Sequence, residues 1–255
     1  MKVVILAGGM GTRLREETDV KPKPMVEIGG RPILWHILKM YAHHGFHEFV
    51  VCLGYKGDVI RDYFVNYEMR NCDVTVTLGS RVMDVHNQHD EQGWRVTLAE
   101  TGDRTLTGSR VKRVARYLDG RFMVTYGDGV SDIDLGALLA HHEAQGRMAT
   151  VTAVRPASRF GQLDVDGHVV QAFHEKPQVE EGWINGGFLV LEPGFLRYVR
   201  GDQSSLEAEA LEAAAADGQL MAFRHEGFWQ CMDTLRDRRL LESLWQSGSA
   251  RWKVW

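Results

Sequence analysis

Hydrophobic positions along the first 155 or so residues alternate between two spacings. Short, nearly continuous apolar runs are typical of buried strands, and they occur at residues 3–6, 49–53, 74–78, 95–98, 122–126 and 149–154. Apolar residues three or four positions apart are typical of amphipathic helices, and they occur at residues 33–42, 58–67, 111–118 and 135–144. The pattern predicts strands that alternate with helices.

This alternation favours one class of fold. Strands separated by helices of about ten residues form βαβ units, whose strands pair in parallel and are covered by helices on both faces. We therefore predict an α/β fold, Rossmann-like, with a mostly parallel mixed sheet. Ligands bind at the carboxyl ends of such strands. Gly8–Gly11 and Gly127–Gly129 both follow predicted strands directly, so we expect them over one site.

The pattern changes after about residue 155. Residues 162–177 carry Asp166-Gly167 between two alternating segments, which indicates a β-hairpin. A further strand is predicted around residues 183–193, and helices are predicted over 206–216 and near 234–245. Since no Pro/Gly/Ser-rich linker intervenes, we expect one domain over residues 1–255. Its nucleotide-binding half would be about 1–155, and its second half, about 156–255, would hold a small β-rich sugar-binding part and the C-terminal helices.

Composition excludes several classes of protein. A formal net charge of −4 gives no basic surface for nucleic acid, so no nucleic-acid partner is expected. No stretch approaches the roughly 18 apolar residues of a membrane span, and no signal peptide is recognisable. The three cysteines, Cys52, Cys72 and Cys231, are odd in number and far apart, which argues against a disulfide scaffold. We expect a soluble cytoplasmic protein without a membrane partner.

The loop after the first strand has the composition of a phosphate-binding loop. It reads Gly8-Gly9-Met10-Gly11-Thr12-Arg13, which lacks the lysine of a Walker A loop and the third glycine of a dinucleotide fingerprint. Backbone N–H groups freed by glycines can bind phosphate oxygens, and Thr12 and Arg13 add a hydroxyl and a guanidinium. A simple turn remains the alternative for the glycines alone.

A pair of lysines follows this loop. In Lys21-Pro22-Lys23-Pro24, each proline disfavours the helical conformation for the lysine before it. Residues two apart in an extended chain point the same way, so we expect Lys21 and Lys23 to form one cationic rail.

Together these segments resemble a known signature. LAGGMGTRL followed by KPKPM is similar to the motif of the sugar-1-phosphate nucleotidylyltransferases. The resemblance continues through TGSRVKRVARY, TYGDGVSDID, HEKPQ, INGGFLVLEP and GFWQCMDTLRDRRLLESLW, and so covers essentially the whole chain. It is closest to the members that use CTP and glucose 1-phosphate, and it implies transfer of a cytidylyl group with release of pyrophosphate.

The resemblance implies a role for specific residues. It implies that Mg²⁺ is the cofactor, bound by Asp128 and Asp233, and that Arg13 and Lys23 are catalytic. The nucleotide-binding set it implies is Leu6, Ala7, Gly8, Gly9, Met10, Gly11, Thr12, Arg13, Lys23, Thr105, Gly108, Arg110, Gly127 and Asp128. The sugar-phosphate-binding set it implies is Gly161, Glu175, Lys176, Asn185 and Gly186. Nearby Asp132 and Asp134 fit a helix cap better than a metal site.

Some positions depart from the family pattern. Ser109 replaces an expected glycine, Cys231 a proline, and Gln162 a smaller residue near the sugar. Alternatives therefore remain: a uridylyl- or thymidylyltransferase, a cytidylyltransferase with another phosphorylated acceptor, or a sugar-nucleotide-binding module without catalysis.

The histidines form no complete metal-binding pattern in the sequence. His44/His47 and His86/His89 have H-x-x-H spacing, but no third ligand is near them in the sequence, so we expect surface or interface histidines. The resemblance implies a homo-oligomer, up to a hexamer. The C-terminal Trp245, Trp252 and Trp255 would cover the core or form subunit contacts.

Overall fold

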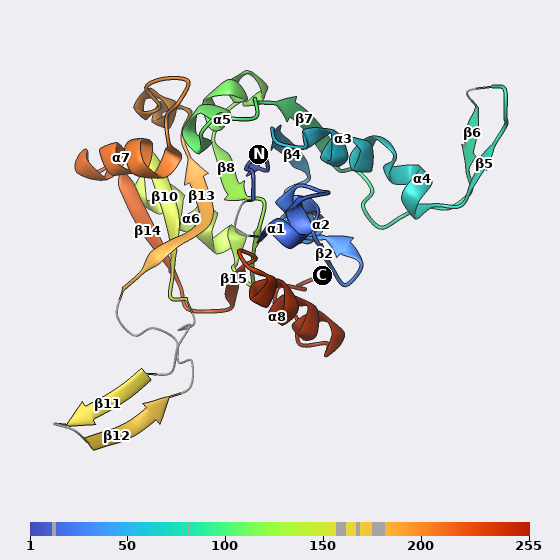
Figure 1. The fold of residues 1–255 in the computed structure, drawn as a ribbon. Helices are drawn as coiled ribbons and strands as arrows, with labels where there is room; N and C mark the ends of the chain where they lie inside the picture. Colours follow the sequence, from blue (N-terminus) through green and yellow to red (C-terminus); the bar gives the residue numbers. More distant parts are fainter. Residues whose placement is uncertain (12–13, 81, 157–161, 167–168, 175–181) are drawn as a thin grey trace.

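Seven strands form the central sheet of the protein (Figure 1), in the order β14-β10-β13-β8-β1-β4-β7. The computed structural model describes residues 1–255 except 12–13, 81, 157–161, 167–168 and 175–181. The sheet strands are β1 Lys2–Leu6, β4 Glu48–Leu53, β7 Arg95–Glu100, β8 Phe122–Tyr126, β10 Ala149–Val154, β13 Ile184–Leu191 and β14 Leu220–His225. Within this sheet β13 runs antiparallel to β10 and β8, whereas the other pairings are parallel. The predicted mostly parallel mixed sheet is confirmed.

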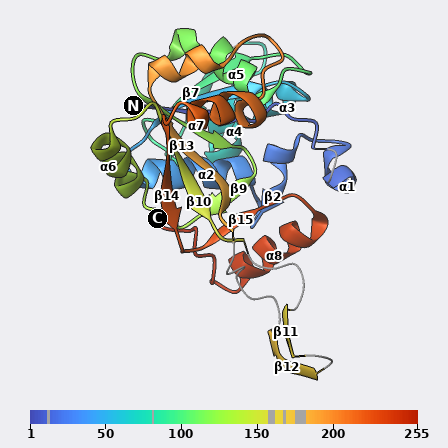
Figure 2. The ribbon, with the colours of Figure 1, turned by 90° about the vertical axis from the view of Figure 1, so that its left-hand side faces the viewer.

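Helices cover both faces of this sheet, as Figures 1 and 2 show. Val3 and Ile5 of β1 pack into one hydrophobic core, which also takes Ile37 of α2. Val4 belongs to the other core, together with Val111 of α5. Successive side chains of a strand point to opposite faces, and the continuous apolar run of β1 is the sequence signature of a strand buried on both sides.

The helices agree with most of the predicted ranges. They are α1 Arg15–Thr18, α2 Ile33–His43, α3 Gly57–Val65, α4 Tyr67–Asn71, α5 Thr107–Arg113, α6 Leu135–Gln145, α7 Glu212–Ala216 and α8 Leu235–Gln246. Short 3₁₀ turns occupy Lys23–Met25, Ala115–Tyr117 and Pro193–Tyr198, and a π-helical segment, Leu206–Leu211, precedes α7. Asp134 accepts a hydrogen bond from Ala137 N and so caps α6, as predicted.

Small two-strand sheets lie outside the central sheet. They pair β2 Glu27–Ile28 with β3 Arg31–Pro32, β5 Val74–Val76 with β6 Met83–Val85, β9 Gly129–Ser131 with β15 Trp229–Cys231, and β11 Gln162–Asp166 with β12 Val169–His174. The predicted hairpin is β11–β12. The apolar run at 74–78 is not a strand of the central sheet but part of the projecting β5–β6 hairpin (Figure 1). Among the described residues, no helix is long and apolar enough to cross a membrane.

The C-terminal tryptophans close the core beside α2. The indole N–H of Trp252, which is 1% exposed, donates to Nδ1 of His36 at 3.4 Å. The Nε2 of His36 lies 2.8 Å from the carbonyl oxygen of Ile28. Burial lowers the pKa of His36 to about 4, so the ring is neutral at pH 7 and both of its nitrogens have partners.

His36 should therefore make stability fall as the solution becomes acidic. Its pKa is lower in the folded chain than in the unfolded chain, so the unfolded chain binds more protons between pH 6.5 and pH 4. The contribution of His36 should be complete above pH 6.5, and about 3 kcal/mol of it should be lost by pH 4. Urea unfolding of the wild type and of His36→Leu at pH 7 and pH 4 measures this difference. Equal pH dependence in both proteins would contradict it.

Candidate active site

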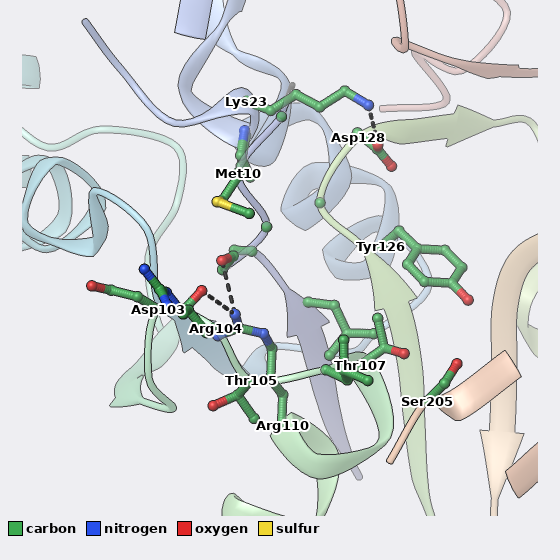
Figure 3. Close-up of a pocket in the computed structure, with 18 of the residues that line it drawn as sticks. Met10, Lys23, Asp103, Arg104, Thr105, Thr107, Arg110, Tyr126, Asp128 and Ser205 are labelled. Carbon is green, nitrogen blue, oxygen red and sulfur yellow. Dashed lines mark hydrogen bonds and ion pairs between the residues drawn. The ribbon is translucent and has the colours of Figure 1, made fainter. Parts of the chain in front are cut away.

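A cavity of about 490 Å³ opens where the two glycine-rich turns meet at the carboxyl ends of β1 and β8. Figure 3 shows the side chains that line it. The described lining residues are Leu6, Ala7, Gly8, Gly9, Met10, Gly11, Lys23, Pro24, Asp103, Arg104, Thr105, Leu106, Thr107, Arg110, Tyr126, Gly127, Asp128, Ser205 and Glu207. The expectation that both turns lie over one site is confirmed.

Arg110 holds the glycine loop in place from below (Figure 3). Its guanidinium donates to the carbonyl oxygens of Gly8, Leu53 and Asp103 at 2.9, 3.0 and 3.3 Å and to the hydroxyl of Thr101 at 2.7 Å. Burial is the main reason why the pKa of Arg110 is lowered. In this structure Arg110 lines the cavity, but its donors are directed at carbonyl oxygens and at the Thr101 hydroxyl of the protein itself.

The second turn lies against the first because both are nearly bare backbone. The amide of Gly127 donates to the carbonyl oxygen of Leu6 at 3.0 Å. A Cβ at Gly127 would lie 2.9 Å from the ring of Pro24 and 3.1 Å from that same oxygen. Glycine is therefore required at this position, and it brings Asp128 to the edge of the cavity.

The pairing of β15 with β9 brings Asp233 next to Asp128. Cys231 of β15 pairs with Gly129 of β9, and Met232 N donates to the carbonyl oxygen of Asp128 at 2.8 Å. Asp233 then lies just before α8, which begins with a capping box formed by Thr234. The ladder thus brings together two carboxylates that are 105 residues apart in the sequence.

Lys23 lies between these carboxylates. Its ammonium is 2.5 Å from Oδ2 of Asp128 and 2.5 Å from Oδ1 of Asp233, and its side chain is 11% exposed. Burial alone would lower the pKa of Lys23, but the charges and hydrogen bonds of the two aspartates outweigh it, so the pKa is raised. We call Lys23, Asp128 and Asp233 the charged triad.

The two aspartates of the charged triad carry the oxygen ligands of a divalent-cation site. Because both carboxylate oxygens are 2.5 Å from one nitrogen, they are no more than about 5 Å apart. Oxygens on opposite sides of Mg²⁺ are about 4.2 Å apart, so a shift of less than about 1 Å would let one ion contact both. Mg²⁺ binds to one or two carboxylates and completes its shell with phosphates and water. Asp128 and Asp233 therefore fit the predicted metal site, in the place where the ammonium of Lys23 lies. Asp132 is engaged elsewhere, with Arg251 and the amide of Phe228.

The predicted rail of two lysines is wrong. Lys23 begins the 3₁₀ turn Lys23–Met25, so the segment is not extended throughout. Lys21 instead forms an ion pair with Glu27 at 3.6 Å. The two lysines therefore have different partners, and Lys23 is the one that lines the cavity.

Sequence reasoning missed the far wall of the cavity. The hydroxyl of Tyr126 donates to Oε1 of Glu207 at 2.5 Å, and Thr107 Oγ1 donates to Oε2 at 2.6 Å. Burial and the Glu207 charge raise the pKa of Tyr126. Burial opposes ionisation of Glu207, yet its hydrogen bonds lower its pKa, so it is a carboxylate. The sequence signal was Ser205, which caps the helix that starts at Leu206 and places Glu207 in its first turn.

The predicted nucleotide-binding residues of the segment 105–110 are divided between the cavity and the core. Thr105 lines the cavity, and its hydroxyl accepts a hydrogen bond from Arg113 at 3.0 Å. Gly108 instead packs against the backbone of residues 204–206, where a Cβ would lie 2.8 Å from Ser204 O. Ser109 is buried beside it and donates to Gly201 O at 2.7 Å.

Two predicted sugar-site residues lie at the start of β13. The amide nitrogen of Asn185 is 3.4 Å from the hydroxyl of Tyr126, which lines the cavity. Gly186 O accepts a hydrogen bond from the indole of Trp229 at 2.7 Å. The other predicted residues, Thr12, Arg13, Gly161, Glu175 and Lys176, lie outside the described residues, as does the side chain of Gln162.

Both the sequence and the fold of this chain are similar to those of known proteins. Residues 2–237 match the profile of the family described as Nucleotidyl transferase. Proteins named glucose-1-phosphate cytidylyltransferase from Salmonella typhi and Salmonella typhimurium are each 54% identical, over 100% of both chains. Among solved structures, HddC from Yersinia pseudotuberculosis superposes with a TM-score of 0.68 at 22% identity, over 96% of this chain and 99% of that one. The last likeness concerns the fold alone.

Packing beneath the glycine loop predicts different tolerance at two adjacent glycines. A Cβ at Gly8 would overlap the guanidinium of Arg110, whereas no described atom lies within 4 Å of a Cβ at Gly9. Gly8→Ala should lower the free energy of unfolding by about 1–3 kcal/mol through overpacking, and Gly9→Ala should change it little. Urea unfolding of both variants measures this. Equal stability of the two would show that Arg110 does not constrain the loop.

Proposed function

The chain belongs to the nucleotidyl transferase family, and from this premise we propose that it transfers the cytidylyl group of CTP to α-D-glucose 1-phosphate, giving CDP-glucose and pyrophosphate. The observation that carries the proposal is the charged triad at the mouth of a glycine-lined cavity. The 54% identity to named glucose-1-phosphate cytidylyltransferases supports the choice of substrates.

The reaction needs charge neutralisation and alignment more than proton transfer. A phosphate oxygen of glucose 1-phosphate forms a bond to the α-phosphorus of CTP, while the bond from that phosphorus to the pyrophosphate oxygen breaks. The attacking phosphate is already ionised, so no general base is required. Two polyanions must approach each other, and preorganised cations lower that barrier.

The charged triad would supply this neutralisation. Asp128 and Asp233 would hold Mg²⁺, which when bound neutralises phosphate charge on the nucleotide. Lys23, the residue between them, would act on the α-phosphate in the transition state. The backbone of Gly8, Gly9 and Gly11 would hold the phosphate oxygens, and Arg13 would neutralise the leaving pyrophosphate.

Other residues are assigned to the cytosine base and to the sugar phosphate. Thr105 would contact the cytosine, and Arg110 would fix the loop beside it. For the sugar phosphate, the proposed contacts are Gly161, Glu175, Lys176, Asn185 and Gly186. The family resemblance also favours a cytoplasmic homo-oligomer of up to six chains.

Substrate choice is tested by a matrix of pyrophosphate-release assays. CTP, UTP and dTTP are each combined with glucose 1-phosphate and with other sugar 1-phosphates, at a fixed Mg²⁺ concentration. We expect CTP with glucose 1-phosphate to give the highest kcat/KM. A higher value with another nucleotide or acceptor would replace the proposal by that activity. Binding without turnover in every cell would indicate a non-catalytic module.

The two aspartates should be needed for turnover rather than for folding. Asp128→Asn and Asp233→Asn each keep the side-chain size but remove a metal-binding charge. We expect each to abolish most turnover, with little change in the urea midpoint. Near-native activity of either variant at limiting Mg²⁺ would show that the residue does not hold the metal.

The two lysines should differ in how they affect the kinetics. Lys23→Ala should lower kcat roughly 10²–10³-fold, the size of effect seen when one preorganised transition-state donor is removed. Lys21→Ala, whose parent side chain pairs with Glu27, should act weakly and mainly on KM for CTP. Both are assayed at fixed ionic strength, because salt screens exposed charges. A larger loss of kcat in Lys21→Ala than in Lys23→Ala would assign the catalytic role to Lys21.

A further inference from the structure

Three side chains that bind transition metals converge at the base of the β5–β6 hairpin. Glu68 lies on α4, Cys72 is the residue at which that helix ends, and His89 lies on the segment that follows β6. His89 Nε2 is 3.1 Å from one carboxylate oxygen of Glu68, and Cys72 Sγ is 3.5 Å from the other. The possible ligand atoms of the three residues lie within 4.8 Å of one another.

We propose that Glu68, Cys72 and His89 form a Zn²⁺ site. A thiolate, an imidazole and a carboxylate are ligands that zinc takes, and the thiolate selects against Mg²⁺. In a tetrahedral zinc site with bonds of 2.0–2.3 Å, neighbouring ligand atoms are roughly 3.3–3.7 Å apart. The separations of 3.1 and 3.5 Å, which involve different oxygens of Glu68, are close to these values. One ligand atom from each residue lies within 4.8 Å of the others, so side-chain rotations would bring the three onto one ion.

A second carboxylate, that of Glu91, lies near the other ring nitrogen of His89. Nδ1 of His89 lies 3.3 Å from a carboxylate oxygen of Glu91, and the ring packs edge-on to Tyr67 with centroids 4.9 Å apart. Glu91 is itself 7% exposed and accepts a hydrogen bond from the indole of Trp35 at 3.1 Å. Zinc-bound histidines characteristically donate their other ring N–H to such a carboxylate.

Metal binding at Nε2 implies a change of tautomer in His89. Without metal, Nδ1 accepts from the Glu91 amide at 3.1 Å, and Nε2 donates to Glu68. When zinc binds at Nε2, the ring proton lies on Nδ1, so the Glu91 amide gives up its hydrogen bond to Nδ1 and the Glu91 carboxylate accepts the ring proton instead. The Cys72 thiol loses its proton to solvent.

The proposed site is accessible and separate from the charged triad. Glu68, His89 and Glu91 line a second cavity of about 330 Å³. The described lining residues of this cavity include none that line the 490 Å³ cavity. The site joins α4 to the segment that leaves the β5–β6 hairpin, so bound zinc would hold the base of the hairpin against α4.

Co²⁺ provides the test, because it reports thiolate coordination directly. The full-length chain, kept reduced without added thiols and freed of metal by a chelator, is titrated with Co²⁺ in excess Mg²⁺, which occupies the oxygen-ligand site. We expect one Co²⁺ per chain, with a near-ultraviolet thiolate-to-cobalt band and the visible bands of a tetrahedral centre. Added Zn²⁺ should abolish these bands by displacing the cobalt.

Two cysteine variants distinguish the proposed site from the catalytic carboxylates. Cys72→Ser should lose the thiolate band, whereas Cys231→Ser, altered beside Asp233, should keep it. Absence of the band in the wild type would overturn the proposal. So would its loss in Cys231→Ser with retention in Cys72→Ser. Circular dichroism confirms that both variants are folded.

A positioning variant tests the role of Glu91. Glu91→Gln keeps the volume but removes the carboxylate behind His89, and it should weaken Co²⁺ binding roughly 10–100-fold. The shape of the saturated spectrum should not change. His86→Ala, at a neighbouring histidine that bonds instead to Thr75, is the matched control and should bind like the wild type. Equal affinity of Glu91→Gln and the wild type would remove Glu91 from the site.

Discussion

Two carboxylates that approach within about 5 Å repel each other unless a cation lies between them, and the active site is organised around this constraint. The β9–β15 ladder brings Asp128 and Asp233 together, and the Lys23 ammonium compensates both charges. Removing Lys23 from this set would leave two close carboxylates uncompensated, whereas neutralising one aspartate would leave a balanced pair. Under the proposed function, the two carboxylates that Lys23 neutralises in the free protein would also be the ligands of the divalent cation.

The rest of the site follows from where this triad is held. Gly127 lets the Asp128 turn lie against the end of β1, and Arg110 fixes the first loop by donating to the carbonyl oxygen of Gly8. Rigid sheet ends and a buried guanidinium fix the geometry before substrate arrives, which is how preorganised electrostatic sites lower barriers. The cavity between the turns is lined by glycine backbone, by the cations Lys23, Arg104 and Arg110, and by the carboxylates Asp103, Asp128 and Glu207.

Some of this could be predicted from the sequence and some could not. Strand and helix periodicity predicted β1, β4, β8 and α2 closely, because their burial is continuous or regularly spaced. Motif resemblance singled out Lys23, Asp128 and Asp233, whose side chains the structure brings together. The expectation that Lys21 and Lys23 point the same way failed, because it assumed an extended chain and a local 3₁₀ turn begins at Lys23. Partners far apart in the sequence, such as Tyr126 with Glu207, leave no local pattern.

The central claim is that Lys23 occupies the place of the divalent cation between Asp128 and Asp233. Mn²⁺ binding without nucleotide, followed by electron paramagnetic resonance of the free ion, tests it most directly in the wild type and in Lys23→Met. The account predicts that Lys23→Met binds Mn²⁺ more tightly, by roughly tenfold or more, because two close carboxylates lose the ammonium that competes with the ion. Equal or weaker Mn²⁺ binding by Lys23→Met would contradict it.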